Sequence, residues 1–501
     1  MNRVAWKCAV VYGVSITILL VSTSGCAPVA DGLRTARSTI PKKWPDFFGN
    51  VRAKEYGAEH ERLWWSSVKD PILQRLIARV VIRSYRVEEA VANWERTAAD
   101  ASYSDSALWP IVQNNLSGTV FRPFTAQGTV ENTSVNGVPI SSANSPQTFS
   151  NVGTTTTFNY EIDLWRSISL TRTQGKLLVR AARADILTAR WLVTVKLVQD
   201  YWQMGAAQEK CNLDRLLVND AVKSAATTGV QYREGFVELG KVLSGRAAIK
   251  NARAILKTCE KNVTMFRTAV AVLVDEDPGK IKINSARLPH GVPRLPSPGV
   301  PAEVLDRRPD VHAARLALEA SILGERIATK AFYPTLTLGG GISTNGAGWS
   351  AVDIIQNPLG YLGVSLALPI LDWKKFSYER ARAKSNFQQS LADFQHTLAL
   401  AIEEVERSYA IRRADIEEYV AAENMLNVEK RKIELVRVRV RNGWVAPQLV
   451  RDALEKKAED ERRVIDARLQ IWLNFLTIQK ALGGPIPRGG TVAKGRKRFD
   501  R

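Results

Sequence analysis

A stretch of 69 residues, from Lys374 to Asn442, contains neither glycine nor proline. A single α-helix of that length would reach roughly 100 Å, whereas helices of globular domains average about a dozen residues. Apolar residues recur along it at steps of three and four, at Phe387, Leu391, Phe394, Leu398, Ile402, Val405 and Tyr409. Ordinary helix cores also contain such a seam, but the length of the stretch favours coiled-coil packing. The sequence therefore predicts one very long coiled-coil helix.

The same local pattern occurs twice along the chain, at a constant offset of 208 positions. "REGFV" at 233–237 is matched by "RNGWV" at 441–445, "IDLWRS" at 162–167 by "ILDWKK" at 370–375, and "LVDEDPG" at 273–279 by "ALGGPIP" at 481–487. The first-half counterpart of the long helix is 166–233, which is interrupted by three glycines. These matches indicate a tandem duplication within one chain.

Each half also contains two segments in which apolar residues alternate with small or polar ones. They are "TLTLGGGIS" at 335–343 and "GYLGVSLALPI" at 360–370 in the second half, and "TFNYEIDLW" at 157–165 and a weaker alternation from Pro110 to Phe124 in the first. A period of two with one apolar face predicts half-buried strands. The stretch 125–152, rich in Gly, Ser, Thr and Asn, predicts a loop.

The N-terminus has the pattern of an export signal. Arg3 and Lys7 precede an apolar segment from Ala9 to Val21, which is too short to span a bilayer, and "STSGCAP" follows. The small residues directly before Cys26 resemble a bacterial lipoprotein signal, in which the cysteine is lipidated and starts the mature chain. Thr23 stands where such signals usually have leucine, so the alternative is a plain signal cleavage nearby.

Four amphipathic strands behind an export signal favour a transmembrane β-sheet. Four strands cannot close a barrel in lipid, because open edges would leave backbone groups unpaired, so several chains must contribute. Three copies would supply twelve strands, an even number within the known range. The predicted fold is mixed and mainly α: a long coiled-coil α-helical barrel continued by a transmembrane β-barrel, with four strands per chain, completed by trimerisation. Gly235 and Gly443 would then set the turns at the tips of two helical hairpins, because glycine readily adopts a positive φ.

Further motifs carry a resemblance to a known family. They are "LWWSSVKDPILQRLI" at 63–77, "YEIDLWRS" at 160–167, "PAEVLDRRPDVHAAR" at 301–315, "AFYPTLTL" at 331–338 and "ALGG" at 481–484. Over about residues 26–485 the chain resembles a TolC-type outer-membrane factor of the lipoprotein (NodT-like) branch of efflux channels. The expected division is a lipoprotein signal peptide (1–25), an extended segment after the anchor (26–60), a first repeat (61–280), a second repeat (281–485) and a basic tail (486–501).

The resemblance implies a function and a set of partners. It implies a passive homotrimeric duct that is lipid-anchored in the cell outer membrane and exports drugs, toxic compounds or metals. The implied partners are a periplasmic adaptor and an inner-membrane pump of the resistance-nodulation-division type. A type I protein secretion duct and a non-channel coiled-coil scaffold or adhesin are the alternatives, and the paired strands argue against the scaffold. The formal charge of +20 suits a polyanion or only a solvated basic surface. The export signal excludes a soluble nucleic-acid binder, and the resemblance places outer-membrane lipid among the partners.

The resemblance also assigns the hairpin tips to adaptor docking. The tip residues are Arg233, Gly235, Phe236 and Val237 in the first repeat and Arg441, Gly443, Trp444 and Val445 in the second. The alternative is that the two aromatic rings only pack between neighbouring helices.

The resemblance also implies a periplasmic gate, because this family closes the tip end at rest with residues just after the second turn, including a ring of aspartates. Asp452 lies nine residues past Gly443, and three copies would form a negative ring that favours cations, with repulsion offset by bases such as Arg451. The family usually has a large apolar residue where Gln448 stands and often a base where Glu455 stands. Because a polar constriction dewets less readily, we expect a leakier closed state than is usual. The alternative is that Asp452 is a solvated helix residue.

The sequence does not favour an enzyme, a metal site or a bound cofactor. His60, His290, His312 and His396 are scattered, and no common catalytic motif occurs. The glycines at 339–341 precede no helix, so they do not form a phosphate loop. In "RRPD" at 307–310, the proline and aspartate fit helix capping. Whether Cys211 and Cys259 meet in space cannot be read from their spacing.

Overall fold

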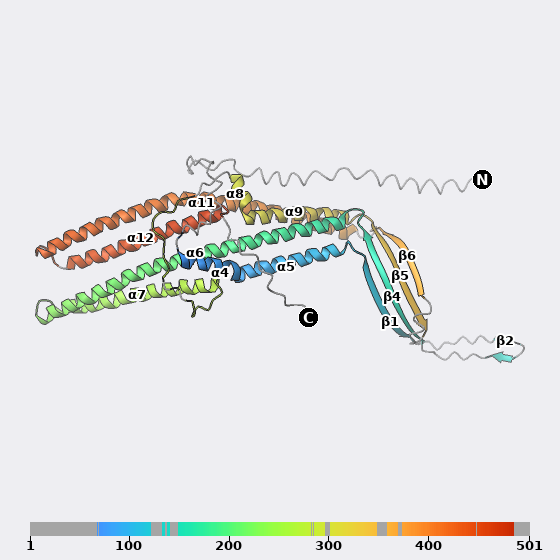
Figure 1. Ribbon diagram of the computed structural model, residues 1–501, viewed down its shortest axis with the longest axis horizontal. Coiled ribbons are helices and arrows are strands. Elements are labelled where there is room, and N and C mark those ends of the chain that lie inside the picture. The colour runs from blue at the N-terminus through green and yellow to red at the C-terminus, as the bar shows by residue number, and fades with distance from the viewer. Residues whose placement is uncertain are drawn as a thin grey trace. The chain divides into compact units, whose positions relative to one another are not determined.

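The computed structural model describes residues 68, 70–121, 133–135, 138–140, 149–281, 283, 285–295, 301–347, 358–368, 373–446 and 448–484 (Figure 1). The predicted signal peptide, Cys26, the extended segment before residue 61, the tryptophans at 64 and 65 and the basic tail lie outside these residues. The chain divides into two compact units. One comprises residues up to Arg96, Arg180–Leu318 and the chain from Gln389 onward, and the other comprises Thr97–Val179 and Glu319–Gln388.

The helices and strands follow the order expected of two repeats. The helices are α4 (Pro71–Arg83), α5 (Tyr85–Ser106), α6 (Ser167–Arg233), α7 (Leu239–Leu273), α8 (Pro301–Arg307), α9 (Pro309–Lys330), α11 (Trp373–Arg441) and α12 (Gln448–Ala481). The strands are β1 (Ile111–Phe121), β2 (Thr133–Val135), β3 (Val138–Ile140), β4 (Phe149–Ile162), β5 (Thr335–Ala347) and β6 (Pro358–Ala367).

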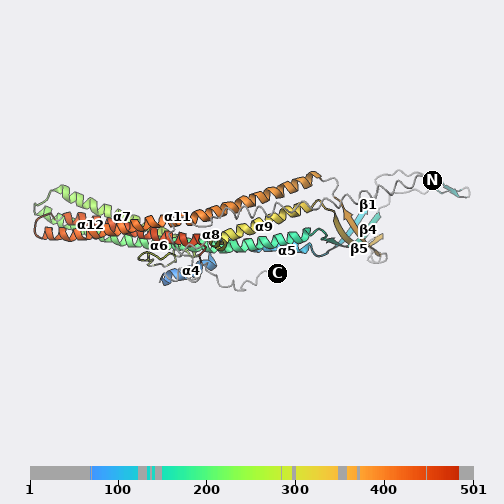
Figure 2. The same cartoon turned by 90° about the horizontal axis from the view of Figure 1, so that it is seen from above.

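The helix ends confirm the tandem duplication. The ends of α6 and α11, at Arg233 and Arg441, are 208 positions apart, and so are the ends of α7 and α12, at Leu273 and Ala481. The predicted long helix is α11, with 69 residues, and its counterpart α6 has 67. In both views α6 runs beside α7 and α11 runs beside α12 (Figures 1 and 2).

The four long strands form one antiparallel sheet in the order β1-β4-β5-β6. Its register places Val112 opposite Phe158, Phe158 opposite Gly340, and Gly340 opposite Leu362. Because side chains alternate between the faces of a strand, the face of Val112 and Phe158 is mainly apolar and the opposite face is mainly polar. The polar face includes Gln113, Asn115, Thr155, Thr157, Asn159, Thr337, Ser343 and Ser365.

The prediction of a loop over 125–152 was wrong for part of that stretch. β4 already begins at Phe149, and β2 pairs with β3 in a short hairpin. The threonine run from Thr154 to Thr157 has high strand propensity, and pairing with β1 on one side and β5 on the other extends the strand past Gly153.

The consecutive glycines of β5 make room for aromatic rings. A Cβ at Gly340 would lie 2.4 Å from the ring of Phe158, and one at Gly341 would lie 3.0 Å from the ring of Tyr361. Alternation places these rings on opposite faces of the sheet. The three glycines are therefore part of the strand packing, as the absence of a following helix suggested.

The larger unit has its core where α4, α6, α7 and α12 meet. Leu73 and Ile77 of α4 pack with Tyr201 and Trp202 of α6, all of them buried. Asp70 caps α4 by accepting hydrogen bonds from the backbone N–H groups of residues 72 and 73, at 2.9 and 3.2 Å. Its other carboxylate oxygen accepts from the hydroxyl of Tyr201 at 2.7 Å. The Asp-Pro helix start is thus both a cap and a link between α4 and α6.

Candidate functional site

The two hairpin tips have the same backbone structure. In the first, the N–H of Gly235 donates to the carbonyl of residue 232 at 3.0 Å and the N–H of Phe236 to that of residue 231 at 2.8 Å. In the second, Gly443 donates to residue 440 at 3.0 Å and Trp444 to residue 439 at 2.9 Å. This pair of bonds closes a helix with a residue in the left-handed conformation, and φ is +78° at Gly235 and +71° at Gly443. The predicted turns are confirmed.

The tips present aromatic and basic side chains to solvent within a single chain. Phe236 is 79% exposed and Trp444 is 73% exposed, so neither ring packs its own hairpin. Arg233 and Arg441 are also exposed, whereas Val237 and Val445 are half-buried beneath the turns. Each tip therefore offers apolar area beside positive charge.

Asp452 lies in the second turn of α12 and is exposed. Its carboxylate accepts a hydrogen bond from the side-chain amide of Gln448 at 3.2 Å. In the part of the chain that the structure describes, no ion pair joins Asp452 to Arg451, which is half-buried, and Glu455 is exposed. The structure thus places all four predicted gate residues on the first two turns of one helix, with Gln448 as the contact of Asp452.

Ion pairs that sequence reasoning missed join α12 to α6. They link Arg462 to Asp214, Asp466 to Lys210, and Arg468 to Glu209. Asp214 and Arg468 are almost fully buried. These pairs join the helix that carries Asp452 to the first repeat. Their members are about 250 residues apart in sequence, so the local spacing rules for helical pairs could not have found them.

A buried network surrounds Arg308 of the "RRPD" motif. Its guanidinium contacts both carboxylate oxygens of Asp310, at 3.1 and 2.7 Å, and the carboxylate of Glu404 at 2.9 Å. It also donates to the carbonyl of Ala481 at 3.1 Å, and Lys480 reaches Glu404 at 2.7 Å. The proline and aspartate of the motif stand in the first turn of α9, as expected, and Arg308 joins the start of α9 to α11 and to the end of α12.

The carboxylates of this network are held in their charged form. Burial alone would raise the pKa of Glu404 and of Asp310. Hydrogen bonds and charge from Lys480 and Arg308 outweigh burial at Glu404, and those from Arg308 do so at Asp310. Both pKa values therefore lie below the ordinary range. The arrangement is that of a structural ion cluster.

A disulfide joins Cys211 of α6 to Cys259 of α7, with the Cα atoms 5.6 Å apart. The positions 208 residues later are occupied by Tyr419 and Ala467, which share a hydrophobic cluster between α11 and α12. The first hairpin therefore has a covalent cross-link at the position where the second hairpin has a hydrophobic contact between its two helices. This settles the pairing that the sequence left open.

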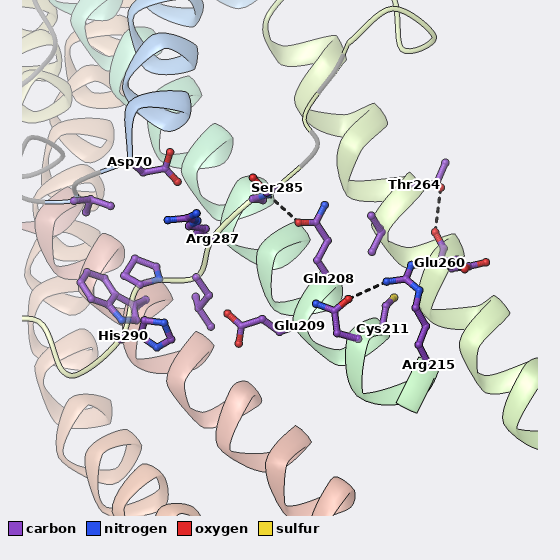
Figure 3. Close-up of a pocket in the computed structure, with 17 residues that line it drawn as sticks. Asp70, Gln208, Glu209, Cys211, Arg215, Glu260, Thr264, Ser285, Arg287 and His290 are labelled. Carbon is purple, nitrogen blue, oxygen red and sulfur yellow. Dashed lines mark hydrogen bonds and ion pairs between the residues drawn. The ribbon is translucent and has the colours of Figure 1, made fainter. Parts of the chain in front are cut away.

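A cavity of about 960 Å³ opens beside the disulfide, between α6, α7 and residues 285–290 (Figure 3). Gln208 accepts a hydrogen bond from the backbone N–H of Ala286 at 2.8 Å. Nδ1 of His290 lies 3.0 Å from a guanidinium nitrogen of Arg468, which also pairs with Glu209. These contacts hold the linker against the helices, and none of them pairs a nucleophile with a base.

No group of three or more His, Cys, Asp and Glu side chains in the described ranges is placed to hold a metal ion. None of the helices described combines the length and the apolar composition needed to cross a membrane.

Comparison with known proteins gives one family. The model of the outer membrane efflux protein family matches residues 76–273 and 300–484, more than half of the chain. The pyoverdine export outer membrane protein OpmQ of Pseudomonas aeruginosa is 24% identical over 384 residues, which cover 76% of this chain and 77% of that protein. The toluene efflux pump outer membrane protein TtgC of Pseudomonas putida is 23% identical over 483 residues, which cover 94% and 95%.

Solved structures share the fold at low sequence identity. The Campylobacter jejuni CmeC outer membrane channel superposes with a TM-score of 0.78 at 20% identity, covering 89% of this chain and 94% of that one. The outer membrane protein VceC of Vibrio cholerae gives 0.70 at 19% identity, covering 84% and 98%.

Proposed function

The chain belongs to the outer membrane efflux protein family, and we propose that three copies of it form a duct through the outer membrane, continued by a helical conduit in the periplasm. The observation that carries this proposal is the sheet. Among the strands that the structure describes, the outer ones, β1 and β6, each pair along one edge only, and lipid does not tolerate unpaired backbone groups. Three sheets joined edge to edge would close a barrel of twelve strands.

The two faces of the sheet suit such a barrel. Val112, Leu116, Leu362 and Val364 are exposed apolar residues on one face, with exposed fractions of 64–72%. The opposite face carries the amide and hydroxyl side chains described above. An apolar outer face toward lipid and a polar inner face toward a water-filled lumen are the pattern of outer-membrane channels. A coiled-coil scaffold requires only the helices, so the presence of amphipathic strands argues against that alternative.

The conduit ends at the hairpin tips, and we assign adaptor docking to them. An exposed Phe236 or Trp444 next to an arginine offers the aromatic and basic residues that recur at protein interfaces. The adaptor would connect the duct to an inner-membrane pump of the resistance-nodulation-division type. The names of OpmQ and TtgC, which refer to pyoverdine export and a toluene efflux pump, support small molecules as cargo.

A second candidate role is export of proteins. The toxin and drug export protein A of Aggregatibacter actinomycetemcomitans is 20% identical over 401 residues, and its name covers a toxin as well as drugs. The adaptor that co-purifies after cross-linking in cells would separate the roles. An adaptor encoded with a resistance-nodulation-division pump supports efflux, and one encoded with a type I secretion exporter supports protein export.

We assign the periplasmic gate to Asp452, with Gln448, Arg451 and Glu455 around it. Three copies of an exposed carboxylate at the narrow end would attract cations and repel anions. The hydrogen bond from Gln448 orients the carboxylate without neutralising it. The proposed duct is passive and catalyses no reaction.

We also propose that Cys26 carries acyl chains and starts the mature protein. The residue after it, Ala27, is not the aspartate that commonly retains such lipoproteins at the inner membrane. Mass spectrometry of the mature N-terminus tests this. An unmodified N-terminus at another residue would refute the lipid anchor and leave the duct unaffected.

The trimer is tested by native mass spectrometry of the full chain extracted from membranes in mild detergent. The expected mass is that of three mature chains. A stable monomer or dimer that still inserts into lipid would overturn the closed twelve-stranded barrel.

A further inference from the structure

Aromatic side chains mark the end of the sheet at which the long helices begin. In the smaller unit, β1 and β5 start at this end, and β4 and β6 finish there. Trp109, Trp165, Tyr333 and Trp373 follow or precede these four strand ends, and Trp109 and Trp373 are more than 70% exposed. Trp165 packs on Tyr333 with ring centroids 4.9 Å apart. Such a row is typical of the boundary between a bilayer and water.

The first three turns of α11, directly beyond this row, carry excess positive charge. Residues 373–384 contain one acid, Glu379, and five bases: Lys374, Lys375, Arg380, Arg382 and Lys384. All five bases are exposed, and none forms an ion pair with a carboxylate in the described part of the chain. Along the rest of α11 nine bases are balanced by ten acids, and pairs such as Arg407–Glu403 form at 3.2 Å. Residues 385–429 contain three bases and nine acids, and positive charge is in excess again at the tip end, where residues 430–441 contain six bases and one acid. The sheet-end cluster is the one that lies directly beside the aromatic row.

The first repeat has the same charge at equivalent positions. Arg166, Arg172 and Lys176 stand 208 residues before Lys374, Arg380 and Lys384. No acid lies between Trp165 and Lys176, although Arg172 pairs with Asp105 at 2.9 Å. Both helices that leave the sheet thus begin with an aromatic residue followed by bases.

We propose that the five bases of residues 373–384, which we call the headgroup collar, bind the phosphate of anionic phospholipids, with phosphatidylglycerol in the inner leaflet of the outer membrane as the occupant. The inference rests on the proposed function, which places the sheet in that membrane. Charge complementarity selects the occupant, because Lys and Arg near a membrane surface are attracted by the negative charge of anionic lipid. A zwitterionic headgroup has no net charge to attract them.

The spacing along the helix fits a headgroup layer. Lys374 and Lys375 lie within one turn of Trp373, and Lys384 lies at most about 16 Å further along α11 at 1.5 Å per residue. The potential of an anionic surface decays over about 8–10 Å at physiological ionic strength. The first two bases therefore contact phosphates directly, and the later ones lie in the weaker outer part of the field. Tyr378, which is 64% exposed, sits between the two groups of bases.

Native mass spectrometry of the full trimer in detergent, with either phosphatidylglycerol or phosphatidylcholine added, tests the collar. The wild type is expected to retain phosphatidylglycerol in preference, and 0.5 M salt before exchange is expected to weaken the preference by screening. The variant K374Q/K375Q/R382Q is expected to bind phosphatidylglycerol at least about tenfold more weakly. The variant K430Q/R431Q/R439Q removes the same charge from exposed positions far along α11 and is expected to behave like the wild type.

Three results would refute lipid binding by the headgroup collar. Equal retention of the two lipids by the wild type, a preference that salt leaves unchanged, or undiminished binding in K374Q/K375Q/R382Q would do so. An equal loss in both variants would assign the effect to overall charge. The wild type should also conduct in bilayers of pure phosphatidylcholine. Conduction there without lipid preference refutes only the collar, whereas no conduction in any bilayer refutes the duct.

Discussion

The guanidinium of Arg308 lies 2.9 Å from the carboxylate of Glu404, and only 6% and 21% of the two side chains is exposed. Through this contact the start of α9 is joined to the middle of α11. Because Glu404 also binds Lys480 at 2.7 Å, the end of α12 belongs to the same cluster. Near its middle, α11 is therefore held at Glu404 by Arg308 at the start of α9 and by Lys480 of α12.

Replacing Glu404 with alanine is expected to destabilise the protein by about 3–5 kcal/mol, because Arg308 would keep only one of its two carboxylate partners in a buried site. The adjacent Glu403 provides a matched control, since its pair with Arg407 is exposed on the same helix. Glu403→Ala is expected to cost less than about 1 kcal/mol. Chemical denaturation of both variants measures the difference. Equal effects would show that the buried cluster does not stabilise the fold.

The same cluster makes stability fall in acid. The folded-state pKa values of Glu404 and Asp310 are lowered, so both carboxylates bind protons more weakly in the folded state than in the unfolded one. Their contribution is complete above the unfolded-state values of about 4 and disappears as the pH falls through the lower folded-state values. Denaturation midpoints measured from pH 7 to pH 3 should fall less steeply in Glu404→Gln than in the wild type. Identical slopes would contradict this.

The disulfide is expected to stabilise the first hairpin. It closes a loop of 48 residues, for which the chain-entropy model gives about 4 kcal/mol. Denaturation of the C211A/C259A variant should therefore occur at lower denaturant concentration than that of the oxidised wild type. A reductant should lower the wild-type midpoint and leave the variant unchanged. A wild type that is insensitive to reductant under unfolding conditions would argue that the bond does not form.

The tip turn should not tolerate a branched side chain. Gly443→Val places a β-branched residue at a φ of +71°, which is expected to cost about 1–3 kcal/mol and to weaken adaptor binding. Gly229→Ala is the control, because Gly229 lies inside α6 with no positive φ and open space around its Cβ position. It is expected to stabilise the protein by about 0.5–1 kcal/mol. Normal assembly and adaptor pull-down by Gly443→Val would refute the tip assignment.

Local sequence patterns predicted most of the fold, because helix breakers, strand alternation and glycine turns all act on residues that are close together in the sequence. The absence of helix breakers defined α11, the alternation in "TLTLGGGIS" defined β5, and the repeated glycine turns located both tips. The ion pairs between α6 and α12 were not predictable. Whether Arg462 meets Asp214 depends on which helices become neighbours and on how each is rotated about its axis. The contact of Asp452 with Gln448 is of the local kind, because residues four apart on a helix are neighbours, whereas the adjacent Arg451 faces another direction.

The single-channel current of the purified wild type in a planar bilayer, compared with that of Asp452→Ala, tests the duct and its gate together. The account predicts discrete steps from the wild type, with a measurable resting current because Gln448 makes the constriction polar, and with a preference for cations. Asp452→Ala should conduct more and lose much of that preference. Unchanged conductance and selectivity in the variant would remove Asp452 from the gate. A wild type that inserts as a trimer and passes no current under any condition would contradict the duct itself.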